Sequence, residues 1–492
     1  MIKKIRSFLF ENKTAKQTIA KNTFWASVSN FGGRALKAII IIYAARVLGT
    51  NGYGVFSYAV TLAAFFTLFV DPGVNSILIR ESAKADEKER ETLFATTFIM
   101  KLCIVVLIAL VVLFVAPLFS TLPGAKVLLP LVVLIFTFDS LREFFSSLIR
   151  SMEKMEWEAA IFLFTNLMIT VAGFIFLHIA LTPLAFTWAY VAGTAIGAVV
   201  AAYVVRRYLK KIFFAFAPRR IIPILQAAWP FAITGALGGL LTNTDILIIS
   251  WMRSAGEVGI YSAAIRIIQL MYLVPGILQL STLPMFARLA NKDNERFRAA
   301  LERTVSFIFF ASVPLALGGA ILGTQIMQLV FGAAYASGGL SFKILMITLL
   351  FDYPAVIVSN AIFAYNHQKS LIVSSAIGAG ANVALDLLLI PFFGIAGSAT
   401  ATLIAQALSN WYLWHAMKKI NPFEVLPHLR RIITAGVLMA AATTLLFVAG
   451  ANVIANIVVC ALLYFGLLYA FREPLLKEIK RIIVPPSAAA AG

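Results

Sequence analysis

The chain has 492 residues, of which 61% are hydrophobic and 13% are charged, and its formal net charge at pH 7 is +19. This composition excludes a soluble globular protein and predicts an all-α polytopic membrane protein, because the apolar segments are too long and continuous for barrel strands. Nucleic acid is not expected as a partner. The basic residues cluster between apolar segments, where they suit the anionic membrane lipids of the inner leaflet.

In chain order, a basic segment at 1–21 carries Ile2, Ile5 and Leu9 at helical spacing, which predicts a cytoplasmic interfacial helix. About 14 transmembrane helices follow, because about 20 apolar residues suffice to cross a bilayer. We expect these helices at 22–48, 53–79, 92–117, 127–150, 158–181, 184–208, 221–251, 258–287, 300–325, 339–366, 369–391, 393–417, 428–449 and 452–471. Residues 476–492 are expected to form a cytoplasmic tail.

The loops between these segments alternate in charge. One set is basic and includes RSMEKMEWE, RRYLKK and KKINPFEVLPHLRR. The other set, which includes GTNG, STLPGAK and MRSAGE, contains only Lys126 and Arg253 as basic residues. The positive-inside rule therefore predicts a multi-pass protein of the plasma membrane with both termini in the cytoplasm.

The outer loops also bear on enzymatic activity. They are short, whereas a membrane glycosyltransferase that acts at the outer face would need a sizeable loop with carboxylates. The chain also has no GxxxxGK[ST] motif, so it is not expected to hydrolyse ATP. We expect no catalytic residues.

The first predicted helix carries two cations, Arg34 and Lys37, which share one side of the helix. Arg34 lies roughly 18 Å from the start of the helix at about 1.5 Å per residue. A lone cation at this depth costs a few kcal/mol, so both side chains should face a wet cavity or a partner. One interpretation is a salt bridge such as Arg34 with Asp139, and the other is a cationic cavity for an anionic substrate. The adjacent Gly32 and Gly33 would let another helix or a ligand approach closely.

Three features recur in the two halves of the chain. RVLGTNGYGVFSYAVTL resembles SWMRSAGEVGIYSAAIRI, VDPGVNS resembles LVPGILQ, and FTFDS resembles LLFDY. These alignments pair Gly54 with Gly259, Pro72 with Pro275 and Asp139 with Asp352. Parallel repeats of this kind indicate alternating access, with a substrate site between the lobes.

The repeats define the predicted domains. An N-terminal lobe at 22–210 and a C-terminal lobe at 211–419 would each contain six helices around a central cavity, and two extra helices would follow at 420–475.

The chain thereby resembles the multidrug/oligosaccharidyl-lipid/polysaccharide (MOP) flippase superfamily. The resemblance rests on the two lobes, on the LGxxxYGxxSYA-like turn and on GIAGSATATLIAQ at the start of the twelfth helix. Fourteen spans and a basic first helix are similar to the lipid-linked oligosaccharide flippase branch and to the lipid II flippase, whereas drug exporters usually have twelve spans.

This resemblance implies a polyprenyl-diphosphate-linked oligosaccharide as the substrate, moved to the outer leaflet for cell-surface polysaccharide biosynthesis. Fixed cations would replace the hydration of the diphosphate, and the arginine fork can bind two phosphate oxygens. The candidate substrate-binding residues are Arg34, Lys37, Lys101, Arg142 and Arg266, with Asp139 and Asp352. Ion pairs with nearby carboxylates, such as Arg142 with Glu143, are the alternative. Polysaccharide assembly enzymes are candidate partners.

A second candidate site lies in the C-terminal lobe. Asn382 and Asp386 share one helix face, as do Ser398 and Thr402 on the next helix. With Asp245, these residue types match the sodium site of the lipid II flippase, to which Ser398 would contribute a backbone oxygen. The alternatives are proton coupling at Asp386 and a hydrogen-bond cluster without an ion, so sodium as coupling ion is one of three hypotheses and no other cofactor is expected. The alternative function within the same fold is a cation-coupled multidrug exporter, which would have an acidic or aromatic cavity.

Overall fold

The computed structural model describes residues 10–11, 14–119 and 122–476, and every regular element in these ranges is a helix. The predicted all-α fold is therefore confirmed. Most of the predicted interfacial segment at 1–21 and nearly all of the tail at 476–492 lie outside the described residues.

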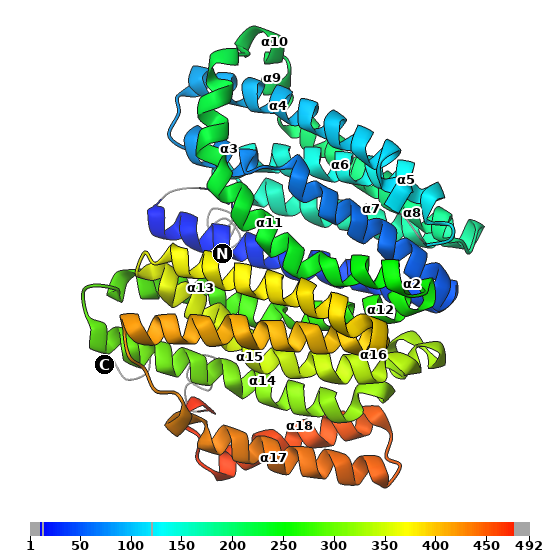
Figure 1. Cartoon of the computed structure of the whole chain (residues 1–492). Coiled ribbons are helices and arrows are strands. Elements are labelled where there is room, and N and C mark those ends of the chain that lie inside the picture. The colour runs from blue at the N-terminus through cyan, green and yellow to red at the C-terminus, as the bar shows by residue number, and fades with distance from the viewer. Residues whose placement is uncertain (1–9, 12–13, 120–121, 477–492) are drawn as a thin grey trace. The chain divides into compact units, whose positions relative to one another are not determined.

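The helices follow one another with short connections (Figure 1). Up to residue 252 they are α2 (Ala15–Val70), α3 (Val74–Ser82), α4 (Glu87–Phe114), α5 (Ala116–Phe119), α6 (Ala125–Ser151), α7 (Met155–Ile179), α8 (Pro183–Val204), α9 (Arg206–Leu209), α10 (Ile212–Ala215), η1 (Pro218–Arg220) and α11 (Ile221–Met252). They continue with α12 (Ala255–Met271), α13 (Leu273–Leu289), α14 (Asn294–Phe331), η2 (Ala333–Gly338), α15 (Gly339–Ala364), α16 (Gln368–Ile420), α17 (Leu426–Val448) and α18 (Val453–Ala470).

Within the described ranges, 11 helical segments are long and apolar enough to cross a membrane. Two of them, in α2 and α16, each contain two predicted spans that are joined by a non-helical glycine, Gly49 with φ 66° and Gly394 with φ 57°. The charged α6 is not among the eleven. The total of fourteen spans stays a prediction.

Two predicted helices are not continuous. The predicted helix at 53–79 ends at Val70 and resumes at Val74, because Pro72 lacks an N–H group and Gly73 has φ 82°. The predicted helix at 258–287 is interrupted at Tyr272, three residues before Pro275. Both interruptions therefore lie at or near the Pro-Gly pair of a repeat.

The helices form two units, Met1–Ala263 and Ala264–Gly492. In the first unit, α2 packs against α6, α7, α8 and α11. The first unit includes α11, whereas the repeats place the lobe boundary at residue 210. The repeat-based boundary remains a prediction.

In the second unit, α15 packs between α14 and α16, and α17 packs against both α14 and α18. Figure 1 shows α17 and α18 side by side near the end of the chain.

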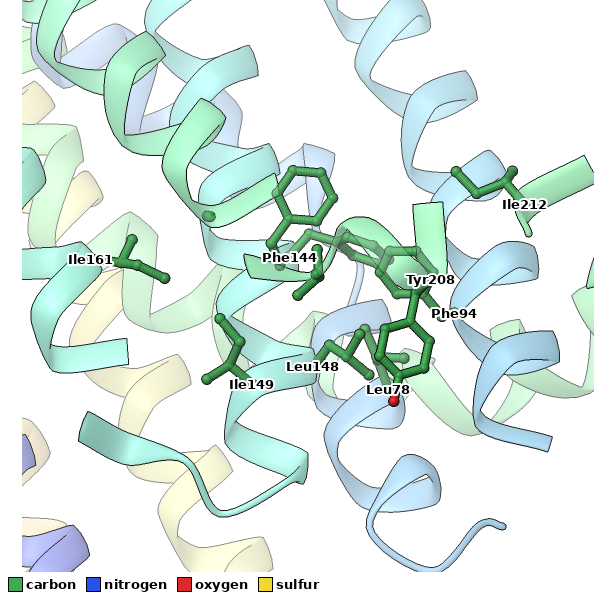
Figure 2. Packing of buried hydrophobic residues seen from close by; sticks show 11 residues of the cluster. Leu78, Phe94, Phe144, Leu148, Ile149, Ile161, Tyr208 and Ile212 are labelled. Carbon is green, nitrogen blue, oxygen red and sulfur yellow. The ribbon is translucent and has the colours of Figure 1, made fainter. Parts of the chain in front are cut away.

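An aromatic cluster fixes the helices that carry the charges of the first unit. Phe94 of α4 lies 5.4 Å from Phe144 of α6 and 5.7 Å from Tyr208 of α9, measured between ring centroids (Figure 2). All three side chains are buried. Burial of these large side chains stabilises the packing of α4 against α6 and α9, and the two tilted ring pairs add aromatic contacts.

Backbones of the two repeat motifs meet in the first unit. A Cβ atom added at Gly54 of α2 would lie 1.7 Å from the Ala255 carbonyl oxygen, and one at Gly259 of α12 would lie 2.1 Å from the Thr50 carbonyl oxygen. Only glycine leaves room for this helix crossing. The two glycines that the repeat alignment pairs therefore lie at the same crossing, that of α2 and α12.

Candidate functional site

Helix α2 presents two cations in different environments. The Arg34 side chain is exposed and makes no ion pair with any residue in the described ranges. Lys37 is half-buried, and its Nζ lies 5.4 Å from the ring centroid of the buried Tyr190. At this distance the aromatic ring attracts the ammonium group. Helix α7 makes the close approach expected at Gly33, where Phe162 packs.

Asp139 is paired within α6 rather than with Arg34. The Arg142 guanidinium donates to Asp139 Oδ1 from Nη2 at 2.8 Å and from Nε at 3.2 Å. Arg142 also lies 3.7 Å from the Glu143 carboxylate, so the expected Arg142–Glu143 ion pair is present. Two hydrogen bonds to a single carboxylate oxygen hold the Arg142 guanidinium in place.

A network of ion pairs continues from Glu143 toward the end of α6. Arg150 binds Glu143 and also lies 3.0 Å from Glu158 of α7. In this network the Glu143 carboxylate forms ion pairs with both Arg142 and Arg150. The end of α6 is thereby tied to α7.

Lys101 of α4 is fully buried, and its Nζ lies 4.0 Å from Asp71 Oδ1 without a hydrogen-bond partner. Asp71 lies at the interruption between α2 and α3, where it accepts the Asn75 backbone N–H at 3.1 Å. The positive charges of Lys37 and Lys101 also act on the Asp139 carboxylate. Lys37, Lys101 and Arg142 therefore gather around Asp139 from three different helices.

We call Arg34, Lys37, Lys101 and Arg142 of the first unit the cationic group. Arg142 and Lys101 have carboxylate partners, Arg34 is exposed, and Lys37 lies against the Tyr190 ring. This arrangement is suited to a polyanion. The ion pairs of Arg142 and Lys101 hold the helices in place, and Arg34 and Lys37 of α2 are the cations that would contact the ligand.

Arg266 and Asp352 belong to the second unit. The Arg266 guanidinium donates to Gln269 Oε1 at 2.9 Å. Asp352 is buried and accepts hydrogen bonds from the Tyr272 hydroxyl and, at 3.1 Å, from Asn410 Nδ2. The repeat partners Asp139 and Asp352 therefore have different surroundings, one ionic and one neutral.

The predicted oxygen-rich cluster lies across the Gly394 joint of α16. Asn382 Nδ2 lies 3.4 Å from Thr402 Oγ1, which donates to the Ser398 carbonyl oxygen at 3.0 Å. Asp386 and Ser398 are fully buried. In the first unit, Asp245 is buried and accepts the Tyr261 hydroxyl at 2.6 Å.

Oxygen donors of this kind suit a hard monovalent cation better than a transition metal. No group of three or more His, Cys, Asp or Glu side chains in the described part of the chain is arranged to hold a metal ion.

Sequence reasoning missed the neutral partners of the charges. These are Tyr190 for Lys37, Tyr261 for Asp245, and Tyr272 and Asn410 for Asp352. A tyrosine in an apolar segment carries no distinguishing spacing, so only Tyr261 inside a repeat motif and Tyr272 near a Pro-Gly pair offered a signal.

A family model described as polysaccharide biosynthesis protein matches residues 19–290. A probable flippase of Haloferax volcanii, AglR, is 28% identical over 179 residues, which cover 36% of this chain and 37% of that protein. A putative O-antigen transporter of Shigella flexneri is 22% identical over 440 residues, which cover 83% of this chain and all of that protein. The chain thus spans little more than a third of the first relative and the whole length of the second.

Two solved structures share the fold. The lipid II flippase MurJ in an inward closed conformation has a TM-score of 0.78 at 18% identity, covering 92% of this chain and 99% of that one. An inward-facing multidrug resistance MATE transporter of the MOP superfamily has a TM-score of 0.60 at 15% identity, covering 85% and 99%. These likenesses establish the architecture.

Proposed function

Since this chain belongs to the polysaccharide biosynthesis protein family, we propose that it is a flippase of the lipid-linked oligosaccharide type. The resemblance to the MOP flippase superfamily, predicted from the helix 1–2 turn and GIAGSATATLIAQ, is confirmed. The chain is a multi-pass membrane protein.

The substrate we propose is a polyprenyl-diphosphate-linked oligosaccharide, moved from the cytoplasmic to the outer leaflet. The observation that carries this proposal is the cationic group, in which Arg34 is exposed and Lys37 is half-buried on a helix that is long and apolar enough to cross a membrane. A diphosphate offers several anionic oxygens, which match guanidinium and ammonium donors. The apolar tail would stay in lipid, because its transfer into a polar cavity would be unfavourable.

Translocation would follow from a change in affinity between two conformations. A headgroup shifts the balance between inward-open and outward-open states only as far as its affinities for the two states differ. Arg34 and Lys37 are suited to supply this difference, because both lie on α2, where Arg34 is exposed and Lys37 is half-buried against the Tyr190 ring.

We also propose sodium as the coupling ion. Asn382, Asp386, Ser398 and Thr402 of the second unit would hold it. The support is that the Asn382 amide, the Thr402 hydroxyl and the Ser398 carbonyl oxygen of α16 come together across one joint. A bound cation would offset the cost of burying the Asp386 carboxylate.

Mass spectrometry of the lipid that copurifies with the protein tests the proposed substrate. We expect a polyprenyl-diphosphate-linked glycan with the unmutated protein and a clear loss of this lipid with Arg34→Ala/Lys37→Ala. The same amount of glycolipid in the double variant would contradict the role of the cationic group. Copurification of phospholipid alone would contradict the substrate.

A further inference from the structure

A cavity of about 680 Å³ opens at one end of the first unit. Its walls come from three predicted outer loops and the helix ends beside them, and include Asn51, Val55, Pro123, Trp251, Arg253 and Ser254. The volume falls within the range of about 300–1,000 Å³ that is typical of small-molecule sites. None of these residues belongs to the cationic group, so the cavity is a separate feature.

One wall of the cavity is held in place by the backbone. The crossing of α2 and α12 at Gly54 and Gly259 fixes the segments on which Asn51 and Ala255 lie. Ser254 also caps α12, because its Oγ accepts the Glu257 backbone N–H at 3.3 Å and its own N–H donates to Glu257 Oε2 at 3.4 Å. A site supported in this way keeps its shape without a ligand.

The wall chemistry combines an aromatic face with polar groups. The Trp251 side chain is 53% exposed although it borders a concave surface. Asn51 and Arg253 supply amide and guanidinium groups at the same cavity. A pyranose ring has an apolar face of C–H groups and an edge of hydroxyl groups, so it matches both parts. A lipid tail would form no hydrogen bonds with the polar groups, and a bare phosphate would not pack against the indole ring.

From this match we infer that the cavity binds sugar rings of the transported glycan at the outer face. The inference rests on the proposed function, since the flippase would deliver the glycan to this side. A headgroup held there after release from the cationic group would be less available for return. The competing explanation is that Trp251 is only an interfacial anchor, because tryptophan is common at membrane boundaries.

The test uses the full chain in lipid nanodiscs and, as probe, the free oligosaccharide released by mild acid from the producing cells' lipid-linked glycan. Binding is measured by saturation-transfer NMR and titration. We expect Trp251→Ala to weaken binding by about tenfold, as for a central aromatic contact, and Trp251→Phe to retain most of it. Asn51→Ala, which changes an exposed side chain, should weaken binding as well. Trp188→Ala is the matched control, because Trp188 is 42% exposed near the start of α8 and does not line the cavity.

Equal binding by Trp251→Ala and Trp188→Ala would overturn the inference, and so would no binding to the unmutated protein. If the lipid-linked glycan is still translocated in that case, the proposed function stands without this site. Binding that depends on Trp251 in a protein that does not translocate the glycolipid would support the site and contradict the flippase proposal. A loss of thermal stability in Trp251→Ala with unchanged binding would make Trp251 an interfacial anchor only.

Discussion

Lys101 places an ammonium group where no solvent reaches it, with Asp71 as a carboxylate 4.0 Å away. Desolvation of such a pair is expensive, and removal of one partner leaves an uncompensated charge. Two apolar or neutral replacements of similar size can therefore be better tolerated than one.

We accordingly expect Asp71→Asn to lower the free energy of unfolding by up to about 3 kcal/mol, because the buried Lys101 charge loses its partner. Lys101→Met/Asp71→Asn should recover most of this loss. Thermal unfolding in detergent measures both. An additive loss in the double variant would show that the two side chains are not coupled.

The partners of single residues could be predicted from the sequence only in part. Arg142 and Glu143 are neighbours in the chain, so their pairing was anticipated, and it is present. The partner of Asp139 is Arg142, three residues along the same helix, rather than Arg34 of α2, and apolar periodicity does not define which residues of α6 and α2 face each other. Apolar periodicity also does not define the neighbour of Lys37, because Tyr190 is more than 150 residues away in the chain.

At the scale of elements, the backbones of α2 and α12 cross so closely that there is no room for a larger side chain at the crossing. Gly259→Leu should destabilise the protein, since its Cβ alone would lie 2.1 Å from the Thr50 carbonyl oxygen. Overpacking of this kind costs about 1–3 kcal/mol or more. Gly466→Leu is the control, because a Cβ at Gly466 of α18 meets no atom within 4 Å. Comparable melting temperatures for the two variants would contradict the tight crossing.

The kinked α16 allows a test of ion coupling. If Asp386 and its neighbours hold sodium, sodium should raise the melting temperature in detergent more than potassium does at equal ionic strength, because binding stabilises the folded state. Asp386→Asn should remove the difference. Identical curves for the unmutated protein in the two salts would favour protonation of Asp386 or a hydrogen-bond cluster without an ion.

Helices were easier to predict than their interruptions. Apolar runs of about 20 residues identify membrane helices by length alone. The interruptions at Asp71–Gly73 and at Tyr272 lie inside such runs, so hydrophobicity continues across them. The Pro-Gly pairs marked both places, but proline is tolerated inside other helices of this chain, such as α6 at Pro130.

At the scale of the whole molecule, the repeats and the contacts give different divisions. Gly54 and Gly259 are equivalent in the repeat alignment, yet both lie in the first unit. Because the alignment follows sequence similarity and the units follow packing, α11 groups with the helices that it contacts. That the chain belongs to this family was nevertheless predictable, since motifs in both halves of the chain supported it.

The proposed account depends on translocation of a lipid-linked glycan by the cationic group. The most direct measurement is a proteoliposome assay in which a labelled polyprenyl-diphosphate oligosaccharide moves between leaflets. We expect rapid transfer with the unmutated protein and with Arg46→Ala, which removes an exposed cation elsewhere on α2. Arg34→Ala/Lys37→Ala should be slower by about tenfold or more, since each charge-assisted hydrogen bond contributes roughly 1.5–3 kcal/mol, while the protein stays folded. Equal transfer rates for the double variant and the unmutated protein would contradict the account.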